Sequence, residues 1–282
     1  MPSYAVIGSS RGIGLEYVRQ LAANPSNIVF ALVRDKSKAT QLIDIAEASK
    51  NVHVVQGDVV DAASLKAAAD EVAKITGGSL DILIYSAART MNETFFHTFF
   101  EYNSFEELDA DFIQAFKVNV LGVIHTINTF LPLLRKGSAK KIVVLGAGAG
   151  NPDFAWKSRF AVMAAYSSTK GASAVVAAKY AVLLEEEGFT VVSLSPGLVN
   201  TADMSTVPPE ILTRQTEAML KMAKFNPDVK YVEQSPEESV SKQLKIIEAV
   251  GQNDAGGLLS HRGLDLVAGG KGGRGLDLSV YV

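Results

Sequence analysis

Short apolar runs recur along the chain and alternate with longer stretches whose apolar residues are spaced by three and four. A short apolar run is typical of a buried strand, whereas spacing by three and four is typical of a helix with one buried face. The strand-like runs are Tyr4–Ile7, Ile28–Val33, Val52–Gln56, Ile82–Tyr85, Ile142–Leu145, Val191–Leu194 and Gly257–Ser260. Helical spacing is found at residues 13–23, 37–48, 62–75, 105–135, 160–187 and 236–250.

Apolar strands separated by helices predict a parallel sheet that is covered on both faces. Because no linker interrupts the alternation, we expect α/β architecture at residues 1–260: a single Rossmann-like, doubly wound parallel sheet of about seven strands with helices on both faces. Residues 261–282 are glycine-rich and repeat RGLDL at 262 and 274, and we interpret them as a tail outside the fold. Residues 202–226 have the length and the helical spacing of a substrate lid.

Composition narrows the classes of partner and site. The chain has 282 residues, of which 48% are hydrophobic, and a net charge of −3. This near-neutral balance gives no reason to expect a nucleic acid or a membrane surface as partner. The chain contains no cysteine, which excludes disulfides, thiolate nucleophiles and zinc–thiolate sites.

Location and metal content are expectations from missing patterns. The N-terminus lacks the pattern of a signal peptide, and the apolar residues 118–134 are too few to span a bilayer comfortably. We therefore expect a cytoplasmic protein in which residues 118–134 form a buried helix. The four histidines show no spacing typical of metal ligands, so no metal is expected; they are His53, His97, His125 and His261.

The first glycine-rich turn, "GSSRGIG" at Gly8–Gly14, follows a strand and opens a helix. Glycines let the backbone approach a pyrophosphate closely, and a helix N-terminus offers free N–H groups and a positive dipole end. The spacing is G-x-x-x-G-x-G, so a tight connection without a ligand is the alternative interpretation of this turn taken alone.

Further motifs follow the turn in a fixed order: "GDV" at 57–59, "VNV" at 118–120, "YSSTK" at 166–170 and "SPGLVNT" at 195–201. Together with the first turn they resemble the short-chain dehydrogenase/reductase family over about residues 3–260. The stretches "SRGIGLEYVRQL" and "SPEESV…GGLLSHRG" resemble the sniffer-type carbonyl reductases, the C-factor-like proteins and the norsolorinic-acid ketoreductase type. The resemblance implies a small-molecule substrate, a nicotinamide cofactor and a homodimer or homotetramer.

The end of the second strand bears on the choice of cofactor. Arg34 lies where NADP-preferring relatives carry an arginine, and Arg11 is a second such position; two guanidinium groups can clamp one phosphate. Asp35 competes, because an acidic residue at the end of this strand would bond the ribose 2′-OH of NAD. A further alternative is that Arg34 and Asp35 form a solvated ion pair. We predict NADP(H). Asp58 resembles the residue that contacts the adenine, although it is equally well explained as a turn aspartate. The residues that the resemblance assigns to the cofactor are Gly8, Ser10, Arg11, Gly12, Ile13, Gly14, Arg34, Asp58, Val59, Ala87, Asn119, Tyr166, Lys170, Pro196, Gly197, Val199 and Thr201.

Tyr166 and Lys170 are four residues apart, so both project from one face of a helix. A nearby ammonium favours the phenolate and brings the pKa of a tyrosine closer to neutrality. The resemblance implies that Tyr166 passes a proton to the substrate oxygen and that Lys170 also holds the ribose. Asn119 matches an asparagine that links the lysine to a proton relay, although an asparagine that merely kinks a helix accounts for part of the same pattern.

The family pattern is broken at the fifth strand, in "IVVLGAGAGNPD". The serine that donates a hydrogen bond to the substrate oxygen in relatives falls on Ala147, and the loss of one such donor costs about a hundred- to a thousandfold in rate. The fourth strand departs as well: Tyr85 begins "YSAA" where relatives read Asn-Asn-Ala-Gly, and Ile7 replaces a threonine that leans on that motif. We expect these two scaffold changes to compensate one another.

Three explanations for Ala147 stay open. Asn151, Asp153 or Ser158 can fold back as a substitute donor; the substrate can need little help, as an imine or an activated ketone does; or the site can perform another reaction. We therefore predict an NADPH-dependent reductase of a carbonyl or imine on an apolar, aromatic or secondary-metabolite substrate. The alternatives are a non-redox or bifunctional enzyme that isomerises or cyclises, and a cofactor-binding sensor.

Large apolar side chains gather in the two segments that interrupt the alternation and in the loop after the fifth strand. They either line a substrate pocket or pack the core and a subunit interface. They include Phe95, Phe96, Phe99, Phe100 and Met219. The candidate substrate contacts are Ala147, Phe154, Trp156 and Met204.

Overall fold

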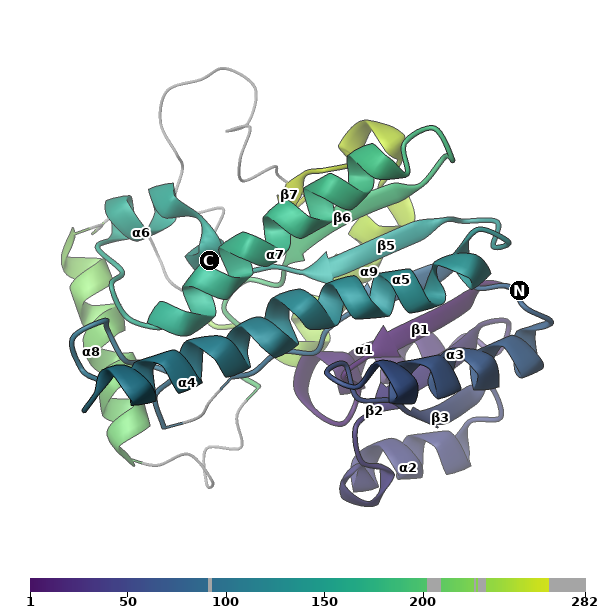
Figure 1. Ribbon diagram of the computed structural model, residues 1–282, viewed down its shortest axis with the longest axis horizontal. Helices are drawn as coiled ribbons and strands as arrows, with labels where there is room; N and C mark the ends of the chain where they lie inside the picture. Colours follow the sequence, from purple (N-terminus) through teal and green to yellow (C-terminus); the bar gives the residue numbers. More distant parts are fainter. Residues whose placement is uncertain (91–92, 202–208, 226, 228–231, 264–282) are drawn as a thin grey trace.

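A seven-stranded sheet, in which every pair of neighbouring strands is parallel, forms the centre of the molecule in the computed structural model (Figure 1). The structure describes residues 1–90, 93–201, 209–225, 227 and 232–263. The strands are β1 Ser3–Ile7, β2 Ile28–Val33, β3 Val52–Gln56, β4 Ile82–Tyr85, β5 Lys141–Leu145, β6 Thr190–Ser195 and β7 Leu258–Ser260. All seven predicted strands are confirmed, and no strand end differs from the prediction by more than one residue.

The strand order β3-β2-β1-β4-β5-β6-β7 creates a switch point between β1 and β4. The chain adds β2 and β3 on one side of β1 and then crosses over to add β4 to β7 on the other side. Open α/β sheets bind ligands at such a point, outside the carboxyl ends of the strands. Here Ile7 pairs with Tyr85 at the ends of β1 and β4, so the first glycine turn and the departure from the family pattern on β4 lie beside each other.

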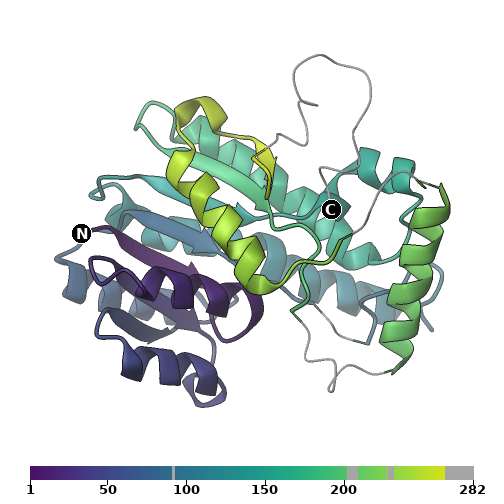
Figure 2. The same ribbon diagram turned by 180° about the vertical axis from the view of Figure 1, so that it is seen from behind.

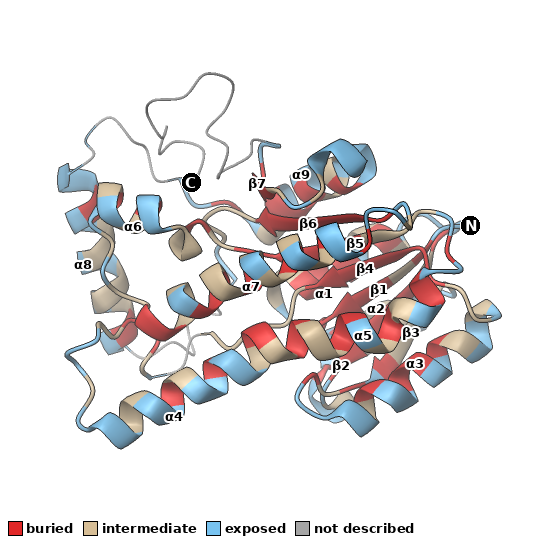
Figure 3. Cartoon of the chain, turned by 45° about the horizontal axis from the view of Figure 1, so that its top comes forward, coloured by how far each residue is buried: buried red, intermediate tan, exposed pale blue. Residues whose placement is uncertain are grey.

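Helices cover both faces of the sheet. Side chains alternate between the two faces along each strand, so apolar strands place a hydrophobic cluster on each face. On β1, Ala5 and Ile7 belong to the core cluster that includes residues of α3, α5 and α7, whereas Val6 belongs to the cluster with α1, α2 and α9. Figure 2 shows α1 and α9 in front of the sheet, and Figure 3 shows buried strands between helices whose outer faces are exposed. The helices are α1 Gly12–Ala22, α2 Thr40–Ala48, α3 Ala62–Thr76, α4 Phe105–Phe116, α5 Gly122–Leu134, α6 Pro152–Ser158, α7 Ala164–Leu183, α8 Pro209–Phe225 and α9 Pro236–Ala249.

Three helices differ from the prediction. The predicted helix 105–135 is divided into α4 and α5 by a π-helical turn at Lys117–Leu121. The helix predicted at 160–187 begins only at Ala164, because Met163 adopts a left-handed conformation with φ of 62° and ends the preceding loop. The short helix α6 was not predicted, since its seven residues, about two turns, are too few to show a helical period.

The span Phe105–Leu134 is long and apolar enough, by length and composition, to cross a membrane; it is the one helix of this kind in the part of the chain that the structure describes. Its second half packs on the sheet, where Val123, Ile127 and Phe130 are fully buried. Burial in the core accounts for its apolar character, as predicted for residues 118–134.

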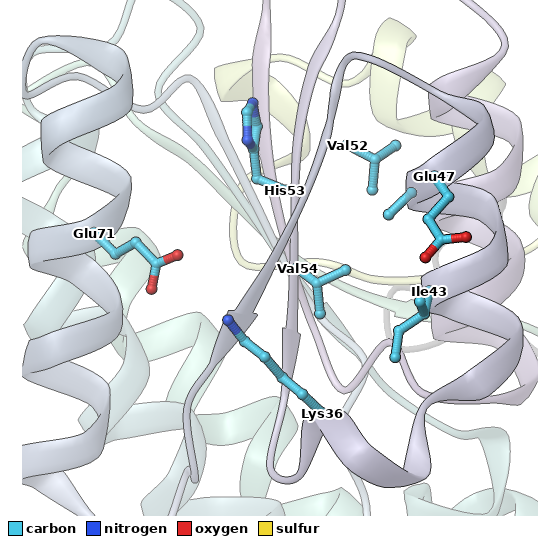
Figure 4. Close-up of a pocket in the computed structure, with 8 residues that line it drawn as sticks. Lys36, Ile43, Glu47, Val52, His53, Val54 and Glu71 are labelled. Atoms are coloured by element: carbon cyan, nitrogen blue, oxygen red, sulfur yellow. The ribbon is translucent and has the colours of Figure 1, made fainter.

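The open edge of the sheet carries a hollow of about 410 Å³ between β3, α2 and α3 (Figure 4). His53 lies on β3, and the other charged residues that line the hollow come from the elements beside this strand: Lys36, Glu47 and Glu71. None of the candidate site residues lines this hollow, so it is separate from the site at the switch point.

Candidate active site

The first glycine turn closes against β4 and leaves the N-terminus of α1 open. Gly8 has φ of 85°, and a Cβ on it would lie 2.7 Å from the backbone of Ala87; a Cβ on Gly14 would collide with the carbonyl of Gly8. The side chain of Arg11, which precedes the first residue of α1, makes no capping hydrogen bond. The first N–H groups of α1 therefore have no side-chain partner at the cap, which fits a phosphate at the helix N-terminus.

Residues from three distant motifs meet at this turn. Ala87 follows β4 and touches Gly8, whereas Thr201 follows β6 and lies 3.3 Å from the position of a Cβ on Gly12. The carbonyl of Leu32 on β2 accepts from the N–H groups of Gly8 and Ser9 at 3.0 and 3.1 Å. The structure thus brings together four segments from which cofactor-binding residues were predicted.

The end of β2 presents arginine without a carboxylate partner. Arg34 and Arg11 are exposed, and neither forms an ion pair within the described residues. Asp35 accepts from the hydroxyl and N–H of Ser37 at 2.6 and 3.0 Å, and the Ser37 hydroxyl lowers the pKa of this carboxyl. The alternative of an Arg34–Asp35 pair is therefore wrong, because the turn after β2 uses the aspartate as its own cap.

Asp58 has the local role that a turn aspartate would have. Its carboxylate accepts from the N–H of Val60 at 3.1 Å, and its own N–H donates to the Ser64 hydroxyl at 3.0 Å. The adjacent Val59 is buried against the position of a Cβ on Gly122. Contact of Asp58 with an adenine stays a prediction.

Tyr166 and Lys170 lie on the first turns of α7, beside the end of β5. The Lys170 ammonium donates to the carbonyl of Leu145 at 2.6 Å and lies 5.6 Å from the centre of the Tyr166 ring. Burial lowers the pKa of Lys170 to about 8 and raises the pKa of Tyr166 to about 12. The expected shift of the Tyr166 pKa toward neutrality is therefore not found in the protein without its cofactor, because burial outweighs the neighbouring ammonium. The geometry unites a proton donor with a neighbouring cation at the carboxyl edge of the sheet.

Asn119 lies in the π-helical turn and is 1% exposed. Its carbonyl oxygen accepts from the N–H of Arg89 at 2.8 Å, and its amide donates to the Thr169 hydroxyl at 2.9 Å. Thr169 is the residue before Lys170. Asn119 thereby connects the loop after β4 to the helix that carries Tyr166.

Tyr85 is a site residue to which the sequence analysis gave no role of its own. The fully buried ring packs between the sheet and α5, and its hydroxyl donates to the carbonyl of Val118, inside the π-helical turn, at 2.6 Å. A Cβ on Gly122 would collide with this hydroxyl. The signal in the sequence was the departure from the family pattern at this position. The role of Tyr85 could not be predicted from it, because the hydrogen-bond partner lies 33 residues away in the sequence.

The second glycine turn packs against α7. A Cβ on Gly150 would lie 2.6 Å from the backbone N of Gly171, and one on Gly146 would lie 2.5 Å from the Ser193 hydroxyl. These glycines allow the loop after β5 to contact α7 and β6 closely. Ala147 lies between them, partly buried.

The three candidate substitute donors bond within their own loop. The Ser158 hydroxyl donates to the carbonyl of Phe154 at 2.6 Å, the Asn151 carbonyl oxygen accepts from Asp153 N–H at 2.8 Å, and Asp153 pairs with Lys157 at 3.8 Å. The hypothesis that one of them folds back as the missing donor is wrong for Ser158, whose only hydroxyl proton is used within α6. For Asn151, whose cited bonds use the carbonyl oxygen and not the amide N–H groups, it stays a prediction.

Aromatic side chains from the segment after β4 do reach Tyr166. Phe95 stands edge-on to the Tyr166 ring with 5.3 Å between the ring centres, and Phe96 and Ile211 of α8 complete a buried cluster. The N–H of Ala164 donates to the carbonyl of His97 at 3.0 Å, which fixes this segment to the start of α7.

The other candidate substrate residues differ in their surroundings. Phe154 is buried and meets the Phe160 ring at 5.8 Å, whereas Trp156 is exposed. Phe99 and Phe100 are exposed too. Met204 lies outside the described residues.

The turn at Pro196–Thr201 is held by residues that the sequence analysis missed. The Ser239 hydroxyl donates to the carbonyl of Pro196 at 2.8 Å, and Gln234 pairs with Val199 in a single bridge. A Cβ on Gly197 would lie 2.7 Å from both the Gln234 amide and Nδ1 of His261. Burial lowers the pKa of His261 to about 4, so this ring is neutral at pH 7. Because His261 is 3% exposed, the expectation that the chain lies outside the fold from residue 261 onward is wrong at this residue.

Comparison with known proteins agrees with the fold. The family model described as short chain dehydrogenase matches residues 3–210. The short-chain dehydrogenase/reductase atnB of Arthrinium sp is 40% identical over 267 residues, covering 93% of this chain and 98% of its own length.

Two solved structures are similar over most of the chain. An NADPH-bound carbonyl reductase from chicken fatty liver has a TM-score of 0.77 and 25% identity, covering 94% of this chain and 93% of its own. The carbonyl reductase Sniffer of D. melanogaster has a TM-score of 0.75 and 20% identity, covering 94% and 98%, and shows the shared fold. The chain therefore belongs to the short-chain dehydrogenase/reductase family of oxidoreductases.

Proposed function

We propose that this enzyme is an NADPH-dependent reductase that reduces a carbonyl or an imine on an apolar, aromatic substrate. The observation that carries the proposal is the pairing of Tyr166 with Lys170 beside an open helix N-terminus. The Lys170 ammonium lies 5.6 Å from the centre of the Tyr166 ring, and the Phe95 ring packs against the same tyrosine. An apolar wall next to a proton donor suits an apolar substrate with one polar reacting group.

The cofactor fits the residues at the switch point. The first turn of α1 would hold the pyrophosphate, and Arg11 and Arg34 would hold a 2′-phosphate with charge-assisted hydrogen bonds. Because Asp35 is occupied by Ser37, it leaves Arg34 free for this role. The preference for NADPH over NADH is supported by this arrangement and by the NADPH bound to the similar chicken enzyme.

The chain's own residues supply the proton. When bound, the reduced nicotinamide supplies the hydride. Tyr166 donates its phenolic proton to the substrate oxygen or nitrogen, and the Lys170 charge favours the phenolate that remains. With a pKa of about 8, Lys170 is mostly protonated at pH 7. Asn119 holds the loop after β4 against α7, so the two groups keep their separation.

Ala147 narrows the substrate class. With alanine at 147 and the Ser158 hydroxyl bonded to the carbonyl of Phe154, the substrate oxygen would receive less help than in relatives with serine. We therefore propose a substrate that is already activated: an imine, a quinone-like ketone or an aryl ketone with its own internal hydrogen bond, of the kind found in secondary metabolism. The same observation favours a second candidate function, a cofactor-dependent isomerisation or cyclisation at this site.

NADPH consumption separates these functions. We expect turnover with aryl ketones or imines, and we expect Tyr166→Phe to lower kcat by about a hundredfold or more with unchanged NADPH binding, because the proton donor is lost. Arg34→Ala should raise KM for NADPH by about tenfold and leave KM for NADH unchanged. NADPH binding with product formation but no cofactor oxidation would establish the non-redox function instead. Binding with neither reaction would leave a sensor.

The wider organisation is proposed on similar grounds. Residues 1–260 form the catalytic domain, and residues 202–226, which contain α8, act as a substrate lid. Exposed apolar side chains on α4 and α7, among them Ile113, Phe116, Val175 and Val182, support a homodimer or homotetramer. The cytoplasmic location stays a prediction.

A further inference from the structure

A second hollow lies where α6 meets α8, which Figures 1 and 3 show side by side at the end of the molecule beyond the sheet. Its volume is about 400 Å³, within the range of small-molecule sites. The lining residues are Ala155, Trp156, Arg159, Phe160, Ala161, Lys221 and Phe225. We call it the α6–α8 hollow.

The guanidinium of Arg159, which lines this hollow, contacts two aromatic rings. Its guanidinium carbon lies 4.3 Å from the centre of the Trp156 ring and 5.9 Å from that of Phe225. Arg159 has φ of 58° and ends α6, while the next N–H, of Phe160, returns to the carbonyl of Ala155 at 3.0 Å. A non-glycine residue in the left-handed region is uncommon, and here it turns the chain so that α6 and α8 share the guanidinium.

Among the described residues, no acidic group pairs with the cations of the hollow. Arg159 and Lys221 are its two cations, and none of its seven lining residues is acidic. Neither cation forms an ion pair within the described part of the chain. The neighbouring Lys157, by contrast, has Asp153 as its partner at 3.8 Å.

The walls of the hollow are aromatic and open to solvent. Trp156 is 71% exposed and Phe225 is 53% exposed, which is unusual for large rings gathered around a cation. Exposed rings supply apolar area and π faces, and a guanidinium matches a carboxylate with two parallel hydrogen bonds. The combination is complementary to a planar ring that carries a carboxylate.

We propose that the α6–α8 hollow is a binding site for an aromatic carboxylate. The ring packs on Trp156 and Phe225, and the carboxylate accepts hydrogen bonds from Arg159 and Lys221. Ile211 of α8 belongs to the Tyr166 cluster, and Lys221 lies ten residues further along the same helix, about 15 Å away. The hollow therefore extends away from the Tyr166 cluster, which it adjoins where Ala161 precedes Val162, and its occupant joins α6 to the proposed lid helix.

The sequence provides a direct probe, because Trp156 is the single tryptophan of the chain. Its emission is measured while the protein is titrated with benzoate, with benzamide as the uncharged isostere, and with acetate and inorganic phosphate as anions without a ring. We expect benzoate to change the emission saturably and to bind about tenfold or more tightly than benzamide, acetate or phosphate, because the site rewards ring and charge together. The readout needs no turnover, so it does not depend on the proposed reductase activity.

Matched variants locate the binding. Arg159→Gln and, on the opposite helix, Lys221→Gln should each weaken benzoate binding, whereas Lys157→Gln, which removes a neighbouring cation that has its own partner, should leave the affinity unchanged. Two variants on different helices keep the test valid when one of them unfolds. Equal affinity for benzoate and benzamide, phosphate binding as tight as benzoate, or unchanged benzoate affinity in both variants would overturn the proposal.

Discussion

Ala147 is the residue whose small side chain defines this site. It follows β5 two residues after Leu145, whose carbonyl holds the Lys170 ammonium at 2.6 Å. The end of β5 thus still positions the lysine while lacking a hydroxyl donor for a substrate oxygen. The nearby Ser158 hydroxyl does not replace that donor, because it bonds to the carbonyl of Phe154.

Restoring the hydroxyl at this position tests whether a donor is missing there. Ala147→Ser places an Oγ at the end of β5, and we expect kcat/KM for a simple aryl ketone to rise by about tenfold or more, with KM for NADPH unchanged. The measurement is steady-state NADPH oxidation, with Ala149→Ser as the control in the same loop. Equal kinetics for Ala147→Ser and the parent enzyme would contradict a vacated donor position.

Lys170 links the site to stability at alkaline pH. Burial lowers its pKa from 10.5 to about 8, so between these values the unfolded chain binds more protons than the folded one, and stability rises with pH in this window. We expect the free energy of unfolding of the parent protein to gain up to about 1.4 kcal/mol per pH unit relative to Lys170→Met. Urea unfolding of the cofactor-free protein at pH 7.5 to 9.5 measures the difference. Parallel pH profiles for the two proteins would refute it.

At the scale of elements, the π-helical turn between α4 and α5 depends on a contact with the sheet. Tyr85 reaches from β4 to the carbonyl of Val118, and Gly122 leaves room for its hydroxyl. A wider turn frees backbone carbonyls from the regular helix pattern, and the tyrosine supplies one of them with a donor. The turn in this geometry presents Asn119 to Arg89 and Thr169.

The fit between Tyr85 and Gly122 predicts a coupled pair. Gly122→Ala should lower the free energy of unfolding by about 1–3 kcal/mol, because the methyl group collides with the hydroxyl, and Tyr85→Phe should lower it by about 1–2 kcal/mol through the lost hydrogen bond. In the double variant the missing hydroxyl makes room for the methyl group, so the loss should be smaller than the sum by about 1 kcal/mol or more. Denaturant unfolding of the four proteins gives the coupling. Additive losses would show that the two side chains do not share this space.

At the scale of the whole molecule, the strand order places the site, and the outer surface of α7 carries exposed apolar side chains. The switch point between β1 and β4 gathers the glycine turn, the π-helical turn and the start of α7 at one edge of the sheet. On the outside of α7, Val182 and Leu183 are 72% and 73% exposed. Exposed apolar positions on a helix that also carries the catalytic pair favour an assembly through this helix.

The oligomeric state can be tested on that surface. We expect the parent protein to elute as a dimer or tetramer, and Val182→Glu together with Leu183→Lys to reduce its mass toward the monomer, because charges in an apolar interface lose their hydration. Size-exclusion chromatography with light scattering measures the mass. Lys179→Glu, an exchange of one charge for another on the same helix, is the control. A monomeric parent protein would rule the assembly out.

The sequence by itself determined the sheet and the outline of the site. Strand periodicity, the Gly8–Gly14 turn and the four-residue spacing of Tyr166 and Lys170 are local properties, because each depends on neighbours within a few residues. For the same reason the order of motifs along the chain was enough to indicate the family and the cofactor turn.

Tertiary structure alone decided which groups meet. The bond from Lys170 to Leu145, the contact of Tyr85 with Val118 and the approach of Arg159 to Phe225 join residues 25, 33 and 66 positions apart. No periodicity records such contacts, since they arise from the packing of whole elements against one another. The same packing removed Ser158 from the possible substitute donors, because α6, too short to be predicted from its sequence, uses the Ser158 hydroxyl for a hydrogen bond of its own.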